Sequence, residues 1–209
     1  MALIRESILK KESSYTTIFS DVCVANLFTQ AHSAMIRAGN ELEELLTKHT
    51  RHSVQPPSKK KKSVYYEDLI LPMSGCTFIP KLTVKGYPGV ENTNLDIAVA
   101  DGDSKIIYTI EMKDGSNFDT KKSKAEREKL QNLTAWLSEM HPDWTVVPKI
   151  ILWQCRDISD ASFKDKLAQP WLTTGRSAES ILGVTFDCVE QSRKAHRDQN
   201  VKDFLLEAR

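Results

Sequence analysis

The clearest hydrophobic pattern along the chain is a pair of short apolar runs joined by a polar turn. The first run, Ile97 to Ala100, follows Asp96, and the second, Ile106 to Ile110, leads into the tripeptide Glu111-Met112-Lys113. The connecting residues 101–104 are Asp-Gly-Asp-Ser, which is typical of a tight turn. Two β-rich runs separated by such a turn predict a β-hairpin.

Two longer segments have helical periodicity instead. Apolar residues recur at helical spacing from Phe19 to Thr50, which predicts an amphipathic helix with Gly39-Asn40 as the point of a break or kink. Thr120 to Met140 predicts a second helix, which is basic in its first half and amphipathic in its second half. His141-Pro142 ends this helix, and residues 146–153 then predict a buried strand.

The order of these elements predicts the fold class. A hairpin followed by a helix and a strand is the arrangement of an α/β crossover. Residues 64–90 predict further β-structure before the hairpin, and residues 157–177 predict a loop-rich link. We therefore expect an α/β domain with a mixed central β-sheet flanked by helices. Residues 1–209 would form it as one domain, with a basic loop at 51–63 and a mainly helical part at 177–209.

Composition excludes several classes of protein. The net charge is only +1, so contacts with nucleic acid must come from local basic patches. The four cysteines lie far apart without metal-ligand spacing, which argues against structural zinc and fits a reducing cytoplasm. Cys23, Cys155 and Cys188 lie among apolar residues and predict buried free thiols. No apolar stretch suits a signal peptide or a membrane span, so we expect a cytoplasmic protein without membrane contact.

The hairpin carries the residues with the most informative chemistry. Side chains alternate between the two faces of a strand, so Glu111 and Lys113 are expected to point the same way. Asp96 lies on the paired strand, within reach of Glu111. Two carboxylates that lie so close together repel each other, and this repulsion raises the pKa of one of them. A divalent cation that prefers oxygen ligands resolves this conflict.

Asp96 followed by Glu111-x-Lys113 at the end of an apolar strand resembles the signature of the PD-(D/E)xK nuclease superfamily, and the chain is most similar to its type II restriction endonucleases. Leu95 stands where the family often has proline. The resemblance implies a restriction-endonuclease-like core that hydrolyses double-stranded DNA with Mg²⁺, for which Mn²⁺ would substitute. It also implies that Asp96, Glu111 and the backbone carbonyl of Met112 hold the metal, and that Lys113 positions or activates the attacking water.

The resemblance also bears on an earlier helix and on assembly. Many type II restriction endonucleases carry an acidic residue on a helix before the catalytic hairpin, near the metal. Glu43 is the candidate here, with Glu41 and Glu44 as alternatives, and a solvated helix charge is an equally good interpretation. Because such an enzyme cuts both strands, a two-fold homodimer on a palindromic site is the simplest assembly.

Two dense basic segments are candidates for contacts with DNA phosphates. The first is the loop that contains Lys59, Lys60, Lys61 and Lys62, and the second is the start of the second helix, with Lys121, Lys122 and Lys124. Positive charges are unfavourable near a helix N-terminus, so lysines at this position suggest that they bind an anion. Such segments can neutralise phosphates, whereas charges that simply face water are the alternative interpretation.

Two alternative functions remain open on the sequence. One is another nuclease of the same superfamily, either RecB-like or RNA cap-cleaving. Gln131 and Trp136 resemble the helix of the RecB-like group, although residues 111–115 do not keep that group's Asp-Tyr-Lys-Thr-Gly pattern. The other is a non-catalytic nucleic-acid-binding module on the same fold, against which the complete set Asp96, Glu111 and Lys113 argues. Trp136, Trp144 and Trp153 are expected to be core anchors rather than platforms on which bases stack.

Overall fold

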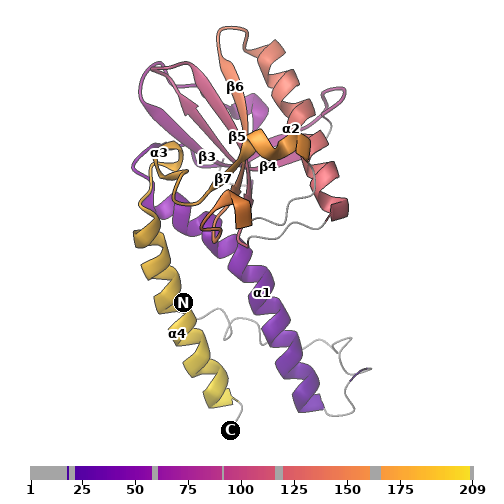
Figure 1. Cartoon of the computed structure of the whole chain (residues 1–209), viewed down its shortest axis with the longest axis vertical. Coiled ribbons are helices and arrows are strands. Elements are labelled where there is room, and N and C mark those ends of the chain that lie inside the picture. Colours follow the sequence, from indigo (N-terminus) through magenta and orange to yellow (C-terminus); the bar gives the residue numbers. More distant parts are fainter. Residues whose placement is uncertain are drawn as a thin grey trace. The chain divides into compact units, whose positions relative to one another are not determined.

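The chain divides into two compact units. Our computed structural model describes residues 18, 22–57, 61–90, 92–115, 120–160 and 166–207. The first unit comprises Met1–Leu45 and Asp187–Arg209, and the second comprises Leu46–Phe186. Helices α1 (Val22–His49) and α4 (Phe186–Glu207) supply most of the described part of the first unit, and the β-sheet lies in the second (Figure 1).

The second unit is built on a seven-stranded mixed sheet. The strand order is β1-β3-β4-β5-β6-β7, and β2 also pairs with β3. Strand β4 runs antiparallel to both of its neighbours, β3 and β5. Strands β1 and β2 run parallel to β3, and β6 and β7 continue parallel to β5. The strands span Ser53–Val54 (β1), Val64–Tyr65 (β2), Cys76–Val84 (β3), Thr93–Asp101 (β4), Ile106–Lys113 (β5), Thr145–Leu152 (β6) and Leu172–Thr174 (β7).

The predicted hairpin is confirmed as β4 and β5. These strands pair from Asp101 opposite Ile106 to Ile97 opposite Ile110. The Asp101 carboxylate holds the turn, because it accepts hydrogen bonds from the Asp103 amide at 3.0 Å and from the Ser104 hydroxyl at 2.5 Å. A side chain that binds the backbone two residues ahead is the reason that Asp favours such turns.

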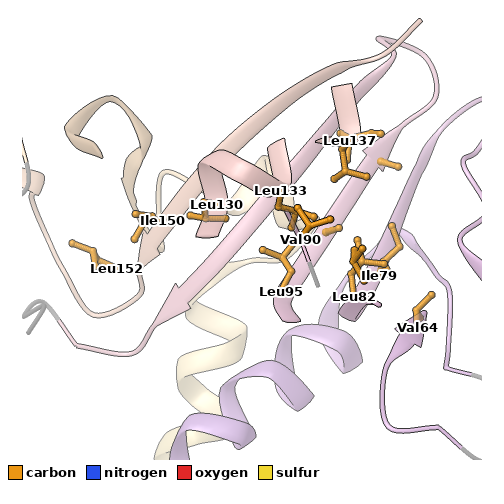
Figure 2. Close-up of a cluster of buried hydrophobic side chains, with 14 of the residues drawn as sticks. Val64, Ile79, Leu82, Val90, Leu95, Leu130, Leu133, Leu137, Ile150 and Leu152 are labelled. Carbon is orange, nitrogen blue, oxygen red and sulfur yellow. The ribbon is translucent and has the colours of Figure 1, made fainter. Parts of the chain in front are cut away.

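The helix between β5 and β6 has the predicted bounds, Thr120–Met140, and is labelled α2. It packs on β5 and β6, and its leucines join a buried cluster with the sheet (Figure 2). That cluster includes Leu130, Leu133 and Leu137 from α2 and Ile79, Leu82, Leu95, Ile107, Ile150 and Leu152 from the strands. An α/β fold with a mixed central sheet and flanking helices is therefore confirmed.

Other elements differ from the expectations. Helix α1 runs without a break through Gly39-Asn40, where a break or kink was predicted; residues 19–21 lie outside the described part. The segment expected as a loop-rich link contains the edge strand β7. In the C-terminal part, α3 (Glu179–Leu182) ends at Gly183, whose φ of 66° lies in the left-handed region that glycine favours. The remaining short helices are η3 (Tyr66–Asp68), η4 (Ile158–Asp160) and η5 (Lys166–Trp171).

Core side chains confirm some predictions and correct another. Trp153 is fully buried and stacks on Phe186, with ring centroids 4.8 Å apart, as expected of a core anchor. Cys155 is buried as predicted, but Cys188 is exposed, so that prediction was wrong. Cys188 precedes the buried Val189 on α4, and successive helical side chains point about 100° apart. The side chain of Cys23 lies outside the described residues. Across the part of the chain that is described, no helix combines the length and apolar character of a membrane span.

We expect the turn of the hairpin to be sensitive to a single methyl group. A Cβ atom on Gly102 would lie 2.6 Å from the carbonyl oxygen of Pro72 and 2.7 Å from the amide nitrogen of Ser74. Backbone atoms cannot rotate away, so Gly102→Ala should lower the free energy of unfolding by about 2–3 kcal/mol in urea denaturation. The control is Gly89→Ala, where a Cβ atom meets nothing within 4 Å but φ is +82°. The control should lose only about 1 kcal/mol, and an equal loss in both variants would contradict the close packing of the turn.

Candidate functional site

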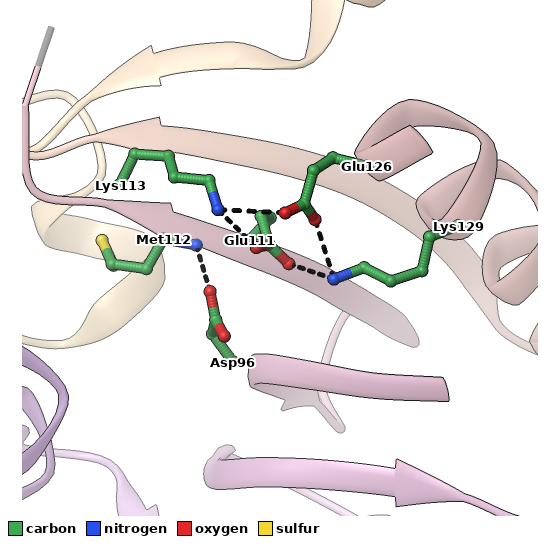
Figure 3. A network of polar contacts seen from close by, with 6 residues as sticks. All are labelled: Asp96, Glu111, Met112, Lys113, Glu126 and Lys129. Carbon is green, nitrogen blue, oxygen red and sulfur yellow. Dashed lines mark hydrogen bonds and ion pairs between the residues drawn. The ribbon is translucent and has the colours of Figure 1, made fainter. Parts of the chain in front are cut away.

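The hairpin brings Asp96 next to Glu111. Ile97 and Ile110 form the last assigned pair of β4 and β5, so Asp96 and Glu111 occupy the next position outward on their strands. The Asp96 carboxylate accepts a hydrogen bond from the Met112 amide at 2.8 Å (Figure 3). One carboxylate is thus anchored to the backbone of the strand that carries the other.

The sheet is irregular at this point. Ile79 and Leu82 on β3 both join the core cluster although they are three residues apart, and strict alternation would place them on opposite faces. Lys81 lies between them with a φ of 53°, and this change in the backbone lets Leu82 point to the same face as Ile79. On β4, Leu95 and Ala98 show the same change of face. Asp96 therefore lies where both strands depart from regular alternation.

Glu111 is the centre of a closed set of ion pairs. Its side chain is only 4% exposed, and its two oxygens contact Lys113 Nζ at 2.8 Å and Lys129 Nζ at 2.6 Å. Glu126 closes the set, because its oxygens lie 3.2 Å from Lys113 Nζ and 2.9 Å from Lys129 Nζ. Figure 3 shows the four side chains alternating in charge, with Glu126 and Lys129 reaching in from α2. We call these four residues the charge ring.

The surroundings shift the pKa of each of the four residues of the charge ring. Burial, and after it the charge of Asp96, raises the pKa of Glu111, and the two lysines offset only part of this rise, so that the pKa is about 7. Burial lowers the pKa of Lys113 and of Lys129, but the carboxylates of the charge ring outweigh burial, so both values lie above the usual range. Burial raises the pKa of Glu126, but its contacts with the lysines outweigh burial and leave its pKa lowered. Glu111 therefore carries the least favourable charge of the ring.

Glu126 and Lys129 were missed as site residues. Lys129 lies in the half of the predicted helix that is basic, and neither residue stands out in the sequence by a motif. A signal was present, because residues three or four apart lie on one helical face. Glu126 lies four residues before the buried Leu130, and Lys129 lies three residues after Glu126. Their spacing thus placed them on the side of α2 that meets the sheet.

The acidic candidates of the first helix belong to the other unit. Glu41 is buried and pairs with His196 Nδ1 of the same unit. Glu44 is exposed. Glu43 is half-buried in α1, and its part in a metal site remains a prediction.

The basic candidates are described only in part. Lys61 pairs with Asp68 at 3.0 Å, and Lys62 is exposed. Lys124 is 70% exposed, with its Nζ 3.8 Å from Glu128. The residues that lie outside the description are Lys59 and Lys60, together with the side chains of Lys121 and Lys122. Where partners are visible, these lysines form weak surface ion pairs, which leaves them able to exchange partners.

The oxygen donors at Asp96 and Glu111 fit a hard divalent cation. Among the residues described, no group of three or more Asp, Glu, His or Cys side chains is arranged to hold a metal. Mg²⁺ does not need such a group, since one or two carboxylates commonly hold it together with water and substrate phosphate. The raised pKa of Glu111 also fits, because a cation would relieve the repulsion from Asp96.

Comparison with known proteins gives one informative similarity. The chain is 24% identical to the type II restriction enzyme HhaII of Haemophilus parahaemolyticus over an alignment of 228 positions, gaps included, which covers 99% of this chain and 93% of the relative. No family model matches the chain. No solved structure matches it either.

The raised pKa of Glu111 predicts a change of stability with pH. Because the folded-state pKa of about 7 exceeds the ordinary 4.5, the folded protein keeps a proton that the unfolded chain releases. This contribution is fully present below pH 4.5 and is lost as the pH rises through about 7, a change of about 3 kcal/mol. In EDTA, Glu111→Gln should therefore gain stability relative to the wild type as the pH rises across this window.

Urea denaturation across this pH window measures the effect. Glu139→Gln, at an exposed position of α2, is the control and should follow the wild type at every pH. A constant difference between Glu111→Gln and the wild type would contradict the raised pKa.

Proposed function

We propose that this protein is a Mg²⁺-dependent endonuclease that hydrolyses phosphodiester bonds of double-stranded DNA. More narrowly, we propose a sequence-specific type II restriction enzyme of the PD-(D/E)xK superfamily. The observation that carries the proposal is the convergence of Asp96, Glu111 and Lys113 at one end of a central hairpin. Similarity to a type II restriction enzyme over almost the full length of both chains supports it.

The residues of the hairpin would divide the work between them. Asp96, Glu111 and the backbone carbonyl of Met112 would hold Mg²⁺. The bound cation would polarise the scissile phosphate and lower the pKa of a bound water. Lys113 would orient this water and offset the negative charge that builds on the phosphate during attack. The water would displace the leaving oxygen directly, so no covalent intermediate with the protein is involved.

A homodimer follows from the same proposal. Each copy carries one set of catalytic residues, whereas a duplex has two strands to cut. Two copies related by a two-fold axis would present one site to each strand of a palindromic sequence.

The charge ring favours one alternative function. Both oxygens of Glu111 already bind lysines, so the four charges of the ring cancel one another without a cation. A non-catalytic nucleic-acid-binding module would keep such a ring purely for stability. Catalysis separates the two functions, because only the enzyme requires Asp96 and Glu111 to accept Mg²⁺.

We expect the wild-type protein to cleave supercoiled plasmid DNA with Mg²⁺ and not with EDTA. Asp96→Ala, Glu111→Ala and Lys113→Ala should each slow cleavage by at least roughly 100-fold, because each removes a group that acts on the transition state. Gel electrophoresis measures the rates, and circular dichroism checks the fold. DNA binding should survive best in the carboxylate variants, which remove negative charge near the phosphate.

The control for these variants is Glu139→Ala, which removes an exposed carboxylate from α2 and should cleave like the wild type. Full cleavage by Glu111→Ala at saturating Mg²⁺ would contradict the metal role. Discrete fragments from a long DNA would support a restriction enzyme, whereas a smear would indicate a less specific nuclease.

The two basic segments should contribute to the salt dependence of DNA binding. Replacing residues 59–62 or the lysines at 121, 122 and 124 by glutamine should weaken binding to all sequences alike. Each lost phosphate contact should also flatten the slope of log affinity against log salt by about 0.9. DNA-binding titrations at several salt concentrations, with Ca²⁺ in place of Mg²⁺, compare the slopes. Unchanged slopes in both variants would show that these lysines do not contact the DNA.

A further inference from the structure

The charge ring raises a difficulty for any cation that binds Glu111. Lys113 occupies one oxygen of this carboxylate, and Lys129 occupies the other. The side chain is 4% exposed, so little room remains for a further partner. A cation that binds Glu111 must therefore take the place of at least one lysine.

The two lysines differ in what holds them. Lys113 lies two residues beyond Glu111 on β5, so the backbone keeps it beside the carboxylate whatever its ammonium group contacts. Lys129 reaches Glu111 from α2 through its flexible stem. Glu126 holds Lys129 at 2.9 Å, closer than the 3.2 Å between Glu126 and Lys113. Lys129 thus keeps a charged partner on its own helix when it leaves Glu111, and it is the lysine that is free to move.

The balance of charge suggests where Lys129 goes. When Asp96 and the charge ring are fully ionised, three carboxylates face two lysines, and the site is negative. A divalent cation reverses that sign and makes the site attractive to a phosphate group. The Lys129 side chain is 28% exposed, so surrounding atoms do not enclose it. A lysine displaced by the cation would thus lie next to the anion that the cation attracts.

We propose that Lys129 is a second lysine of the catalytic site, which occupies Glu111 until a divalent cation binds and then donates to a non-bridging oxygen of the scissile phosphodiester. Glu126 is the positioning residue that keeps Lys129 at the site during this exchange. The inference rests on the proposed nuclease function and names a further residue that would touch the substrate. A structural role would instead keep Lys129 on Glu111 with or without a cation.

The first experiment follows Lys129 in the wild-type protein. An amine-acetylating reagent is applied without cation, with Mg²⁺, and with Ca²⁺ plus plasmid DNA, and the labelled lysines are identified by peptide mass spectrometry. Labelling of Lys129 should rise severalfold with Mg²⁺ and fall again with DNA. Lys105, in the hairpin turn about 25 Å along β5 from Lys113, should label equally throughout.

The second experiment separates cation binding from cleavage. Lys129→Met keeps the apolar stem of the side chain but removes the charge that competes with the cation. It should bind Mg²⁺ about tenfold more tightly in calorimetry without DNA. It should also cleave at least about tenfold more slowly at saturating Mg²⁺. Lys129→Arg should keep the wild-type affinity for Mg²⁺ and part of the cleavage rate, and the control Lys105→Met should change neither.

Distinct outcomes overturn the inference. Unchanged Mg²⁺ affinity in Lys129→Met, or wild-type labelling of Lys129 that ignores Mg²⁺, would show that this lysine does not yield Glu111 to a cation. If Lys129→Met binds Mg²⁺ more tightly but cleaves DNA at the full rate, Lys129 does not contact the scissile phosphate. If Lys129→Met fails to fold, the labelling experiment decides alone. By contrast, a wild-type protein that cleaves no DNA, or whose Mg²⁺ binding survives Asp96→Ala, would overturn the proposed function itself.

Discussion

The buried carboxylate of Glu111, placed beside that of Asp96, is the main electrostatic constraint on this structure. Removing an ionised carboxylate from water costs several kcal/mol, and a neighbouring negative charge adds repulsion. The chain offsets this with two lysines from different elements, Lys113 on the same strand and Lys129 on the helix that follows. Because Lys129 comes from α2, the charge of Glu111 is balanced only when that helix is packed in its place on the sheet. The leucines that pack α2 on the sheet also bring Lys129 to Glu111.

Much of the fold was predictable because its signals are local. Two short apolar runs and the Asp-Gly turn between them defined the hairpin, and helical spacing defined the bounds of α2. The proximity of Asp96 and Glu111 also followed, because the length of the turn sets the register of the two strands. The edge strand β7 was missed, since three residues give no usable periodicity.

The completed site was less predictable, because it depends on how elements pack. Nothing in a linear pattern states that Lys129 crosses from a helix to a strand carboxylate, even though its face of the helix could be inferred. The positive φ of Lys81 is equally hidden, since lysine has no preference for that conformation. Sequence reasoning therefore found the residues that share a strand pair and missed those that arrive from a third element.

The segment between β1 and β2, which contains the basic residues, is attached to β3 and not to the strands that carry Asp96 and Glu111. Strands β1 and β2 pair with the same side of β3, one near Thr77 and the other near Leu82, so both ends of the segment between them are fixed to one strand. Doubling the length of a loop whose ends are already fixed costs only about 0.6 kcal/mol. In evolutionary terms, this segment can gain, lose or exchange residues while the strands behind it keep their register. A lineage of such proteins could thus remodel this segment repeatedly without disturbing the carboxylates on β4 and β5.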